Sequence, residues 1–133
     1  MKQPPIGIRN NNPLNIKYSA SNSWQGQKGE NGGFAVFTSQ EYCFRAAKRI
    51  LSKYFKRGLN TLQEIITVWA PDGEKIVDNY IKYVSDHSHV APNEVLFLEN
   101  TETMTTVLYW MAKFECGGYP IDINRVIRGY KMR

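Results

Sequence analysis

The sequence predicts a mainly helical α+β domain that contains one small β-hairpin. Apolar residues recur at helical spacing over most of the chain after residue 38. Before that point, the stretch SWQGQKGENGGFAVF (23–37) holds two short runs of strand character around a Gly-rich turn. With 133 residues, 42% of them hydrophobic, the chain is long enough to form one domain over residues 1–133 with its own core.

Turn and capping signals divide the first half of the chain. Residues 1–22 are rich in Asn, Pro and Ser and predict an ordered or semi-ordered loop. After the hairpin, the capping-box pattern TSQE (38–41) begins a helix, and Gly58 ends it. The stretch NTLQEIITVWAP (60–71) predicts a short capped helix that Pro71 closes.

The second half predicts mostly helix. The expected segments are a helix at 74–87 with Ile76, Tyr80 and Val84 on one face, a turn or short helix at 93–98, a helix at 101–115, and a last helix, capped by Asp122, through 123–130.

The formal charge of +5 suits a polyanionic partner such as nucleic acid, an anionic membrane face or a bacterial wall. However, the basic stretch AAKRILSKYFKRG (46–58) interleaves cationic and apolar residues, as is typical of the solvated face of an amphipathic helix. The sequence has no RNP, zinc-finger or helix-turn-helix signature, so nucleic acid is not the expected partner. No apolar run approaches the roughly 18 residues of a membrane span, and no signal peptide is expected at the N-terminus.

Neither a metal nor a cofactor is expected. Cys43 and Cys116 show no CxxC or Cys/His spacing, and they are expected to be free thiols. His87 and His89 lie in the polar segment SDHSHV without a nearby set of carboxylates, which makes a poor metal site.

The stretch VLYWMAKFECGGYP (107–120) places one carboxylate at the end of an apolar helix. At about 100° per residue, Met104, Leu108 and Met111 form one stripe, and Glu115 continues it. Apolar neighbours, the negative end of the helix dipole and the absence of a cation in the following Gly-Gly pair are each expected to raise the pKa of this carboxyl group.

A carboxylic acid that stays protonated near neutral pH can act as the general acid in glycosidic cleavage. Gly117 and Gly118, which follow Glu115, would leave open space for a substrate. The structural alternative is that Glu115 rotates into solvent or pairs with Lys113 or Arg125.

A longer pattern resembles one found in phage virion and endolysin-like proteins. There, the opening G-I-R-N-N-N-P-x-N-I leads to W-x-G-Q, an F-x-x-F strand, a helix with R-A and later W-A-P. Leu14 stands where Gly would be expected, but the asparagines of the opening are present. The matching segments, which span nearly the whole chain, are Gly7–Ile16, Trp24–Gln27, Phe34–Phe37, Arg45–Ala46 and Trp69–Pro71.

The chain is also similar to bacterial cell-wall glucosaminidases and other lysozyme-like enzymes. These carry a helix that ends in E-S-G, then a loop close to N-N-x-F-G-I-K, then W-x-G and a hairpin with a second acidic residue. Here NNNPLNIK, WQGQ and the hairpin match, while the acid-terminated helix follows them as AKFECGG near the C-terminus. The resemblance therefore implies a lysozyme-like fold in circularly permuted order, which is tolerable where the two termini lie close together.

This resemblance implies roles for further residues. Glu30 on the hairpin would be the second carboxylate, with a solvated turn residue as the equally supported alternative. Trp24 and Tyr119 would stack on sugar faces. The asparagines of the loop would either bind acetamido groups or stabilise the loop itself. These asparagines are Asn11, Asn12 and Asn15.

Other polar and aromatic residues have structural explanations. Glu41 is explained by the cap of its helix, and Asp72 and Glu74 are expected to cap the next one. Trp69 and Trp110 are expected in the core.

The sequence thus predicts a phage or prophage protein that cleaves peptidoglycan glycan strands as a muramidase, a glucosaminidase or a lytic transglycosylase. The alternative is a non-catalytic virion or secretion-system module of the same fold. Expected partners are peptidoglycan and, for a virion part or an effector, virion or immunity proteins. The expected location is the virion or the bacterial cytoplasm, with action in the periplasm or cell wall.

Overall fold

The computed structural model describes residues 3–70 and 73–133. Within these ranges it contains helices and one two-stranded antiparallel sheet, which confirms the mainly helical α+β class. The elements are α1 (Ile6–Arg9), β1 (Gln27–Asn31), β2 (Phe34–Phe37), α2 (Gln40–Lys56), α3 (Leu62–Trp69), α4 (Glu74–Ser88), α5 (Thr101–Glu115) and α6 (Ile123–Lys131).

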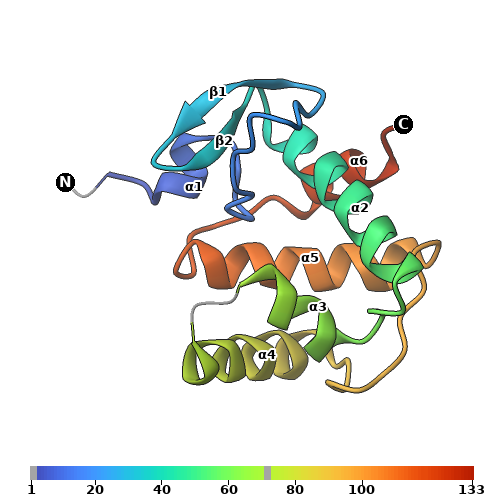
Figure 1. The fold of residues 1–133 in the computed structure, drawn as a ribbon. Helices are drawn as coiled ribbons and strands as arrows, with labels where there is room; N and C mark the ends of the chain where they lie inside the picture. The colour runs from blue at the N-terminus through green and yellow to red at the C-terminus, as the bar shows by residue number, and fades with distance from the viewer. Residues whose placement is uncertain (1–2, 71–72) are drawn as a thin grey trace.

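Helix α5 crosses the middle of the molecule (Figure 1). The hairpin and α1 lie on one side of it, and α3 and α4 lie on the other. Helix α5 packs against α4 and α6, and α6 packs against α2. The core runs along the apolar stripe of α5, where Met104, Leu108 and Met111 are completely buried as predicted.

The helix boundaries test the capping predictions. Helix α5 spans 101–115 as expected, and Asp122 caps α6 by accepting a hydrogen bond from the backbone N–H of Asn124. The capping box expected in TSQE is wrong, because the N-cap of α2 is Ser39 and its side chain makes no capping hydrogen bond. A complete capping box is formed instead by Thr61 and Glu64 at the start of α3.

Two predictions in the N-terminal half need correction. The loop expected over residues 1–22 contains the one-turn helix α1. Glu41 does not serve as a cap, because its carboxylate pairs with Arg125 at 2.9 Å and with Arg128 at 3.2 Å. These contacts join the first turn of α2 to α6.

The face assigned to α4 is also partly wrong. Tyr80 and Val84 are buried as predicted, but Ile76 is 50% exposed and Val77 takes its place against the core. Glu74 lies in the first turn of α4, whose N-cap is Gly73 without a side-chain cap. Residues 93–98 form turns and one isolated bridge, with no helix. The predictions for Pro71 and Asp72 fall outside the described residues.

The Glu41 cluster makes stability depend on pH. Burial raises the pKa of the Glu41 carboxyl group, but the hydrogen bonds from Arg125 and Arg128 lower it by more. The pKa of Glu41 in the folded protein is therefore below 4.5. Its stabilisation is therefore present above pH 4.5 and lost as pH falls through the folded-state pKa. Glu41→Gln should lower the free energy of unfolding by about 1 kcal/mol at neutral pH, measured by urea denaturation. The parent–variant difference should shrink as the pH falls below 4.5 toward the lower pKa of the folded state, and a difference constant with pH would contradict this.

Gly129 lies where α6 meets α2. A Cβ atom at this position would lie 2.3 Å from the backbone oxygen of Glu41 and 2.8 Å from Cβ of Phe44. Because a backbone oxygen cannot move aside, Gly129→Ala should separate the helices and lower stability by about 2 kcal/mol. On an unpacked helix the same change would add up to about 1 kcal/mol of stability. The midpoint of thermal unfolding, measured by circular dichroism, distinguishes these two outcomes. A midpoint higher than that of the parent would mean that α6 does not pack on α2 as described.

Candidate active site

Glu115 is the last residue of α5, and it is half-buried at the end of the Met104–Leu108–Met111 stripe. The chain then turns through Gly117 and Gly118, whose φ angles are 63° and 87°. Such positive angles suit glycine, and a Cβ at either position would meet no atom within 4 Å. The end of α5 is therefore open beyond Glu115, as the sequence predicts.

The N-terminal loop contacts Glu115 directly. Nδ2 of Asn15 donates a hydrogen bond to Oε1 of Glu115 at 3.0 Å, across 100 residues of sequence. Asn15 and Asn11 both have positive φ, 52° and 51°, a conformation that Asn tolerates better than most residues. A permuted lysozyme-like order implies that this loop lies beside the acid, and Asn15 makes that contact, whereas Asn11 donates to the backbone oxygen of Phe37 at 3.2 Å.

Asn12 has a structural role. Its side chain is completely buried, and Nδ2 donates to the backbone oxygens of Ile16 at 2.9 Å and Ala35 at 2.8 Å. Oδ1 accepts from the backbone N–H of Ile16 and from Sγ of Cys43. With its amide fully used and no surface exposed, Asn12 holds the loop against the hairpin, and the structural alternative to substrate binding applies.

Both cysteines are buried free thiols, as predicted, and both hold the same loop. Sγ of Cys116 donates to the backbone oxygen of Pro13, while Cys43 bonds to Asn12. Burial raises the pKa of Cys116 to about 12, and the charge of Glu115 adds to the shift. Burial also raises the pKa of Cys43. The thiols therefore stay protonated and act as packing groups.

Tyr80 of α4 donates from its hydroxyl to the backbone oxygen of Met111 at 3.4 Å and lies near Glu115. Burial raises the pKa of Tyr80 well above 10.0, and the charge of the Glu115 carboxylate raises it further. The hydroxyl therefore stays protonated as a donor. Lys113 donates to the backbone oxygen of Gly118, and Arg125 pairs with Glu41, so both cations proposed as partners of Glu115 have other contacts.

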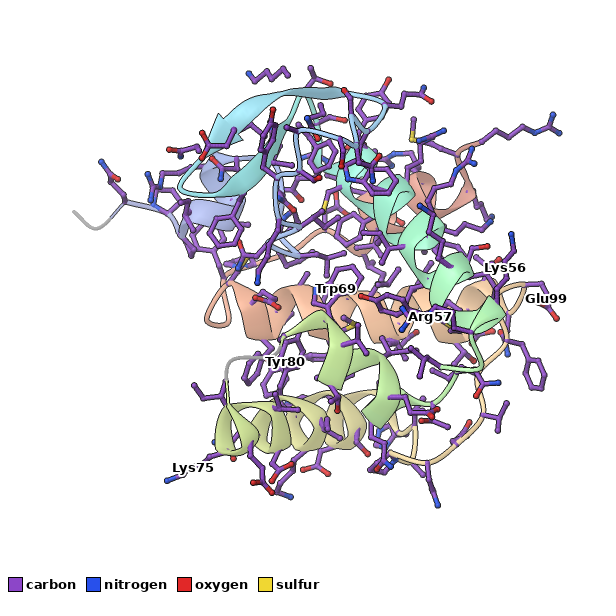
Figure 2. All side chains as sticks on the ribbon, in the orientation of Figure 1. Lys56, Arg57, Trp69, Lys75, Tyr80 and Glu99 are labelled. Atoms are coloured by element: carbon purple, nitrogen blue, oxygen red, sulfur yellow. The ribbon has the colours of Figure 1, made fainter. Side chains whose placement is uncertain are left out.

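A pocket of about 260 Å³ opens beside this contact. Asn15 lines it, so one side chain touches both Glu115 and the pocket wall. Trp69 projects from the end of α3 into the middle of the molecule (Figure 2) and donates from Nε1 to the backbone oxygen of Leu14 at 3.2 Å. The pocket is lined by Asn15, Ile16, Lys17, Ser19, Asn22, Trp24, Ile50, Tyr54, Val68 and Trp69.

Trp24, which is expected to stack on a sugar face, lines the pocket, and so does Trp69, which the sequence assigned to the core. Trp69 packs against the core and also lines the pocket, with its ring edge-on to Tyr54 at 6.4 Å between centroids. The helical period cannot separate a core position from a pocket wall, because both are apolar. The W-A-P segment of the resemblance was the available signal.

Two predicted site residues lie elsewhere. The exposed Glu30 accepts a hydrogen bond from the backbone N–H of Gly33 at 2.7 Å, which closes the hairpin turn. It is not part of the pocket wall, so the turn-residue alternative accounts for its position. Tyr119 is 39% exposed beyond the Gly117–Gly118 turn and is also outside the pocket wall.

One comparison identifies relatives of this chain. It is 34% identical over 130 residues to "Protein P5" of Pseudoalteromonas phage PM2, a match that covers 94% of this chain and 79% of that protein. The chain belongs to the Protein P5 family. No protein-family model matches it. The phage part of the sequence prediction is confirmed by this relationship, and the described part of this P5-family chain has no helix long and apolar enough to cross a membrane.

The histidines of the P5-family chain have structural surroundings. His87 stacks on Trp110 with 4.4 Å between ring centroids and on Tyr83 with 4.3 Å. Trp110 is half-buried in this aromatic cluster, against the core as predicted. Over residues 3–70 and 73–133, no group of three His, Cys, Asp or Glu side chains is placed to hold a metal ion.

Proposed function

We propose that this P5-family protein cleaves the glycan strands of peptidoglycan, with Glu115 as the acid. The observation that carries the proposal is the Asn15–Glu115 hydrogen bond of 3.0 Å at the edge of the pocket lined by Trp24 and Trp69. It places a carboxylate, an amide and two indole rings within one small region. Glu115 does not itself line the pocket, and its hydrogen bond to Asn15 is what joins the two. A carboxyl group held beside a sugar-sized pocket by a rigid helix end suits general acid catalysis.

The order of the elements supports a permuted lysozyme-like arrangement. In the resembling enzymes the acid-terminated helix precedes the Asn-rich loop, and here that helix comes about 100 residues later. The hydrogen bond between Asn15 and Glu115, which spans 100 residues, brings the two segments together in space. A Cβ on Gly7 would lie 3.2 Å from Sγ of Cys116, so the loop also packs closely on the residue after the acid.

The composition of the pocket wall suits an amino sugar. The rings of Trp24 and Trp69 offer flat apolar faces, and the amides of Asn15 and Asn22 can bond to an acetamido group. A volume of about 260 Å³ accommodates about one ring of a glycan, so a longer strand would extend beyond it.

Among the three possible reactions, the structure supports the lytic transglycosylase most. Glu30 closes the hairpin turn and is not part of the pocket wall, which argues against it as the second carboxylate that a hydrolase needs. In a transglycosylase Glu115 would protonate the glycosidic oxygen as the bond to the sugar's C1 breaks. The resulting carboxylate would then take the proton of the same sugar's 6-hydroxyl as that oxygen bonds to C1, which closes an anhydro ring and restores the acid.

A non-catalytic phage module is the second candidate, and one observation favours it. Asn15 hydrogen-bonds to Glu115, and Tyr80 lies near the same carboxylate, so Glu115 also helps to hold the N-terminal loop and α4 at the end of α5. On this reading Glu115 is a structural group, and the pocket binds a glycan or a partner without cutting it.

Mass spectrometry of products from purified peptidoglycan tests the proposal. Soluble fragments with anhydro ends are expected, because the 6-hydroxyl is the attacking group. Fragments with reducing ends would assign the protein to the hydrolases, and a second carboxylate would then have to be found. If walls of several chemotypes release no fragments, the catalytic proposal is wrong and the binding module replaces it.

Trp24→Ala tests the pocket separately from the acid. The substitution removes one apolar wall, and the KM for peptidoglycan should rise about tenfold, or ~1.4 kcal/mol. Tyr18→Ala is a matched control, because Tyr18 is 41% exposed and outside the pocket wall. Equal KM values for the two variants would mean that the glycan binds elsewhere.

A further inference from the structure

The positive charge of the protein is concentrated on two helices. Residues 40–57 and 123–133, which contain α2 and α6, hold ten basic residues and one acidic residue, a net charge of +9. The rest of the chain holds seven basic and eleven acidic residues, a net charge of −4. The overall charge of +5 therefore comes entirely from these two segments. The ten residues are Arg45, Lys48, Arg49, Lys53, Lys56, Arg57, Arg125, Arg128, Lys131 and Arg133.

The structure brings these two segments together. Nε of Arg45 in α2 donates to the terminal backbone oxygen of Arg133 at 2.8 Å, and Nζ of Lys48 lies 4.7 Å from the ring centre of Tyr130 in α6. An open groove of about 550 Å³ between the first turns of α2 and the end of α6 is lined by Arg128 and Lys131 together with Glu41, the carboxylate that Arg128 pairs with. We call the surface formed by the ten cations the basic face. Sequence reasoning considered the α2 cations alone, which predict only a solvated helix.

On α2 the cations form a regular row. Arg45, Arg49, Lys53 and Arg57 follow each other at four-residue intervals, so they project from one side of the helix over about 18 Å. Like charges at this spacing destabilise a helix by about 0.2–0.5 kcal/mol per pair. Glu41 is the sole acidic residue of the two segments, and it is engaged by Arg125 and Arg128. The repulsion within this row therefore lowers the stability of α2, and the one carboxylate side chain of the two segments is not available to reduce it.

The basic face is distinct from the candidate active site. Ile50 and Tyr54 of α2 line the pocket, and each follows a residue of the row by one position, or about 100° around the helix. A ligand on the row would leave the pocket open.

The preference for arginine over lysine on the basic face limits the chemical class of the partner. Six of the seven arginines of the chain are on the basic face, whereas six of the seven basic residues elsewhere are lysines. Simple electrostatic attraction does not distinguish Arg from Lys, but two-pronged recognition of phosphate oxygens does. The enrichment in arginine therefore favours a phosphate-bearing polymer.

The surroundings of the row argue against two other phosphate-bearing partners, a membrane surface and single-stranded nucleic acid. Insertion into a membrane surface needs exposed apolar residues, and Ile123 is the one large exposed hydrophobic residue that the described structure shows on α2 or α6. Single-stranded nucleic acid is bound by exposed aromatic rings, and the aromatic residues of α2 and α6 are all buried or half-buried. Duplex DNA, with one negative charge per about 1.7 Å of axis, needs neither.

We propose that the basic face binds the phosphate backbone of double-stranded DNA without sequence preference. The cations of α2 would follow one strand, and those at the end of α6 would contact phosphates beside it. This activity is independent of glycan cleavage, because it uses neither Glu115 nor the pocket.

Fluorescence anisotropy with a labelled duplex of about 20 base pairs tests the proposal over about 50–200 mM salt. The triple variant Arg49→Gln/Lys53→Gln/Arg57→Gln should bind at least about tenfold more weakly, and the slope of log K against log salt should fall by about three. The control Lys28→Gln/Lys75→Gln/Lys82→Gln removes the same charge from other surfaces and should bind about as the parent does. Equal losses in the two variants would overturn the assignment to this face.

A second variant tests whether the arginine side chains contribute more than their charge. Arg49→Lys/Arg57→Lys/Arg128→Lys keeps the charge, so it should keep the salt slope but bind severalfold more weakly. Unchanged affinity would overturn the proposed two-pronged contact of arginine with phosphate. Glu115→Gln should bind the duplex as the parent does. Parent protein that binds phosphatidylglycerol vesicles or isolated cell walls but not the duplex would overturn the proposal in favour of those surfaces. Thermal midpoints of the row variant should hold or rise, since repulsion is removed.

Discussion

Replacing Glu115 by Gln is expected to reduce wall-degrading activity by at least about a hundredfold. The glutamine keeps the length of the side chain and an oxygen that can accept the hydrogen bond from Nδ2 of Asn15. It cannot deliver a proton to the leaving oxygen or take one back. The loss should therefore appear in kcat, with KM little changed, because the pocket wall is intact.

The stability of the same variant separates the two candidate functions. If Glu115 is catalytic, the thermal midpoint of Glu115→Gln should stay within a few degrees of that of the parent. If the carboxylate serves to fasten the loop, a weaker bond to Asn15 should lower the midpoint while any activity persists. Parent-level digestion by Glu115→Gln would remove the main support for the catalytic proposal.

Glu30→Gln is the matched control, since it makes the same chemical change in the hairpin turn. The Gln oxygen can still accept from the N–H of Gly33, so folding should be little affected. A transglycosylase with one acid should retain most of its activity. A loss as large as that of Glu115→Gln would instead mean that Glu30 is the second carboxylate of a hydrolase.

The apolar period predicted α5 from its first residue to its last. Met104, Leu108 and Met111 recur on one side over nearly the whole helix, and Asn100 and Gly117 mark its ends, so local signals were consistent. The face of α4 was less certain, because Ile76 and Val77 are adjacent apolar residues and only tertiary packing decides which one is buried. The period itself allows either.

The site was predicted in part. That Glu115 ends a buried stripe follows from helix geometry, but its contact with Asn15 depends on how distant segments meet, which the resemblance alone indicated. The capping pattern TSQE failed because Glu41 gains more from two arginines of α6 than from a backbone N–H. Those arginines are more than 80 residues away in sequence, so no local rule includes them.

The second large effect is expected from Asn12→Ala. The substitution would leave the backbone N–H of Ile16 and the oxygen of Ala35 without their side-chain partner inside the protein, while the oxygen of Ile16 keeps the N–H of Ala35. Buried polar groups that lose their partners cost about 1–3 kcal/mol each. Stability should therefore fall by about 3 kcal/mol or more, and the thermal midpoint by about 10 °C.

Asn11→Ala is the control for this loop, because Asn11 is half-buried and its side chain makes one hydrogen bond, to Phe37. It also has positive φ, so some loss is expected, but less than at Asn12. Urea denaturation of both variants gives the comparison. Since Asn12 fixes the loop that carries Asn15, activity of Asn12→Ala should fall even at temperatures where the protein remains folded. If the two variants unfold at the same urea concentration, the buried amide does not organise the loop, and the placement of Asn15 beside Glu115 must have another cause.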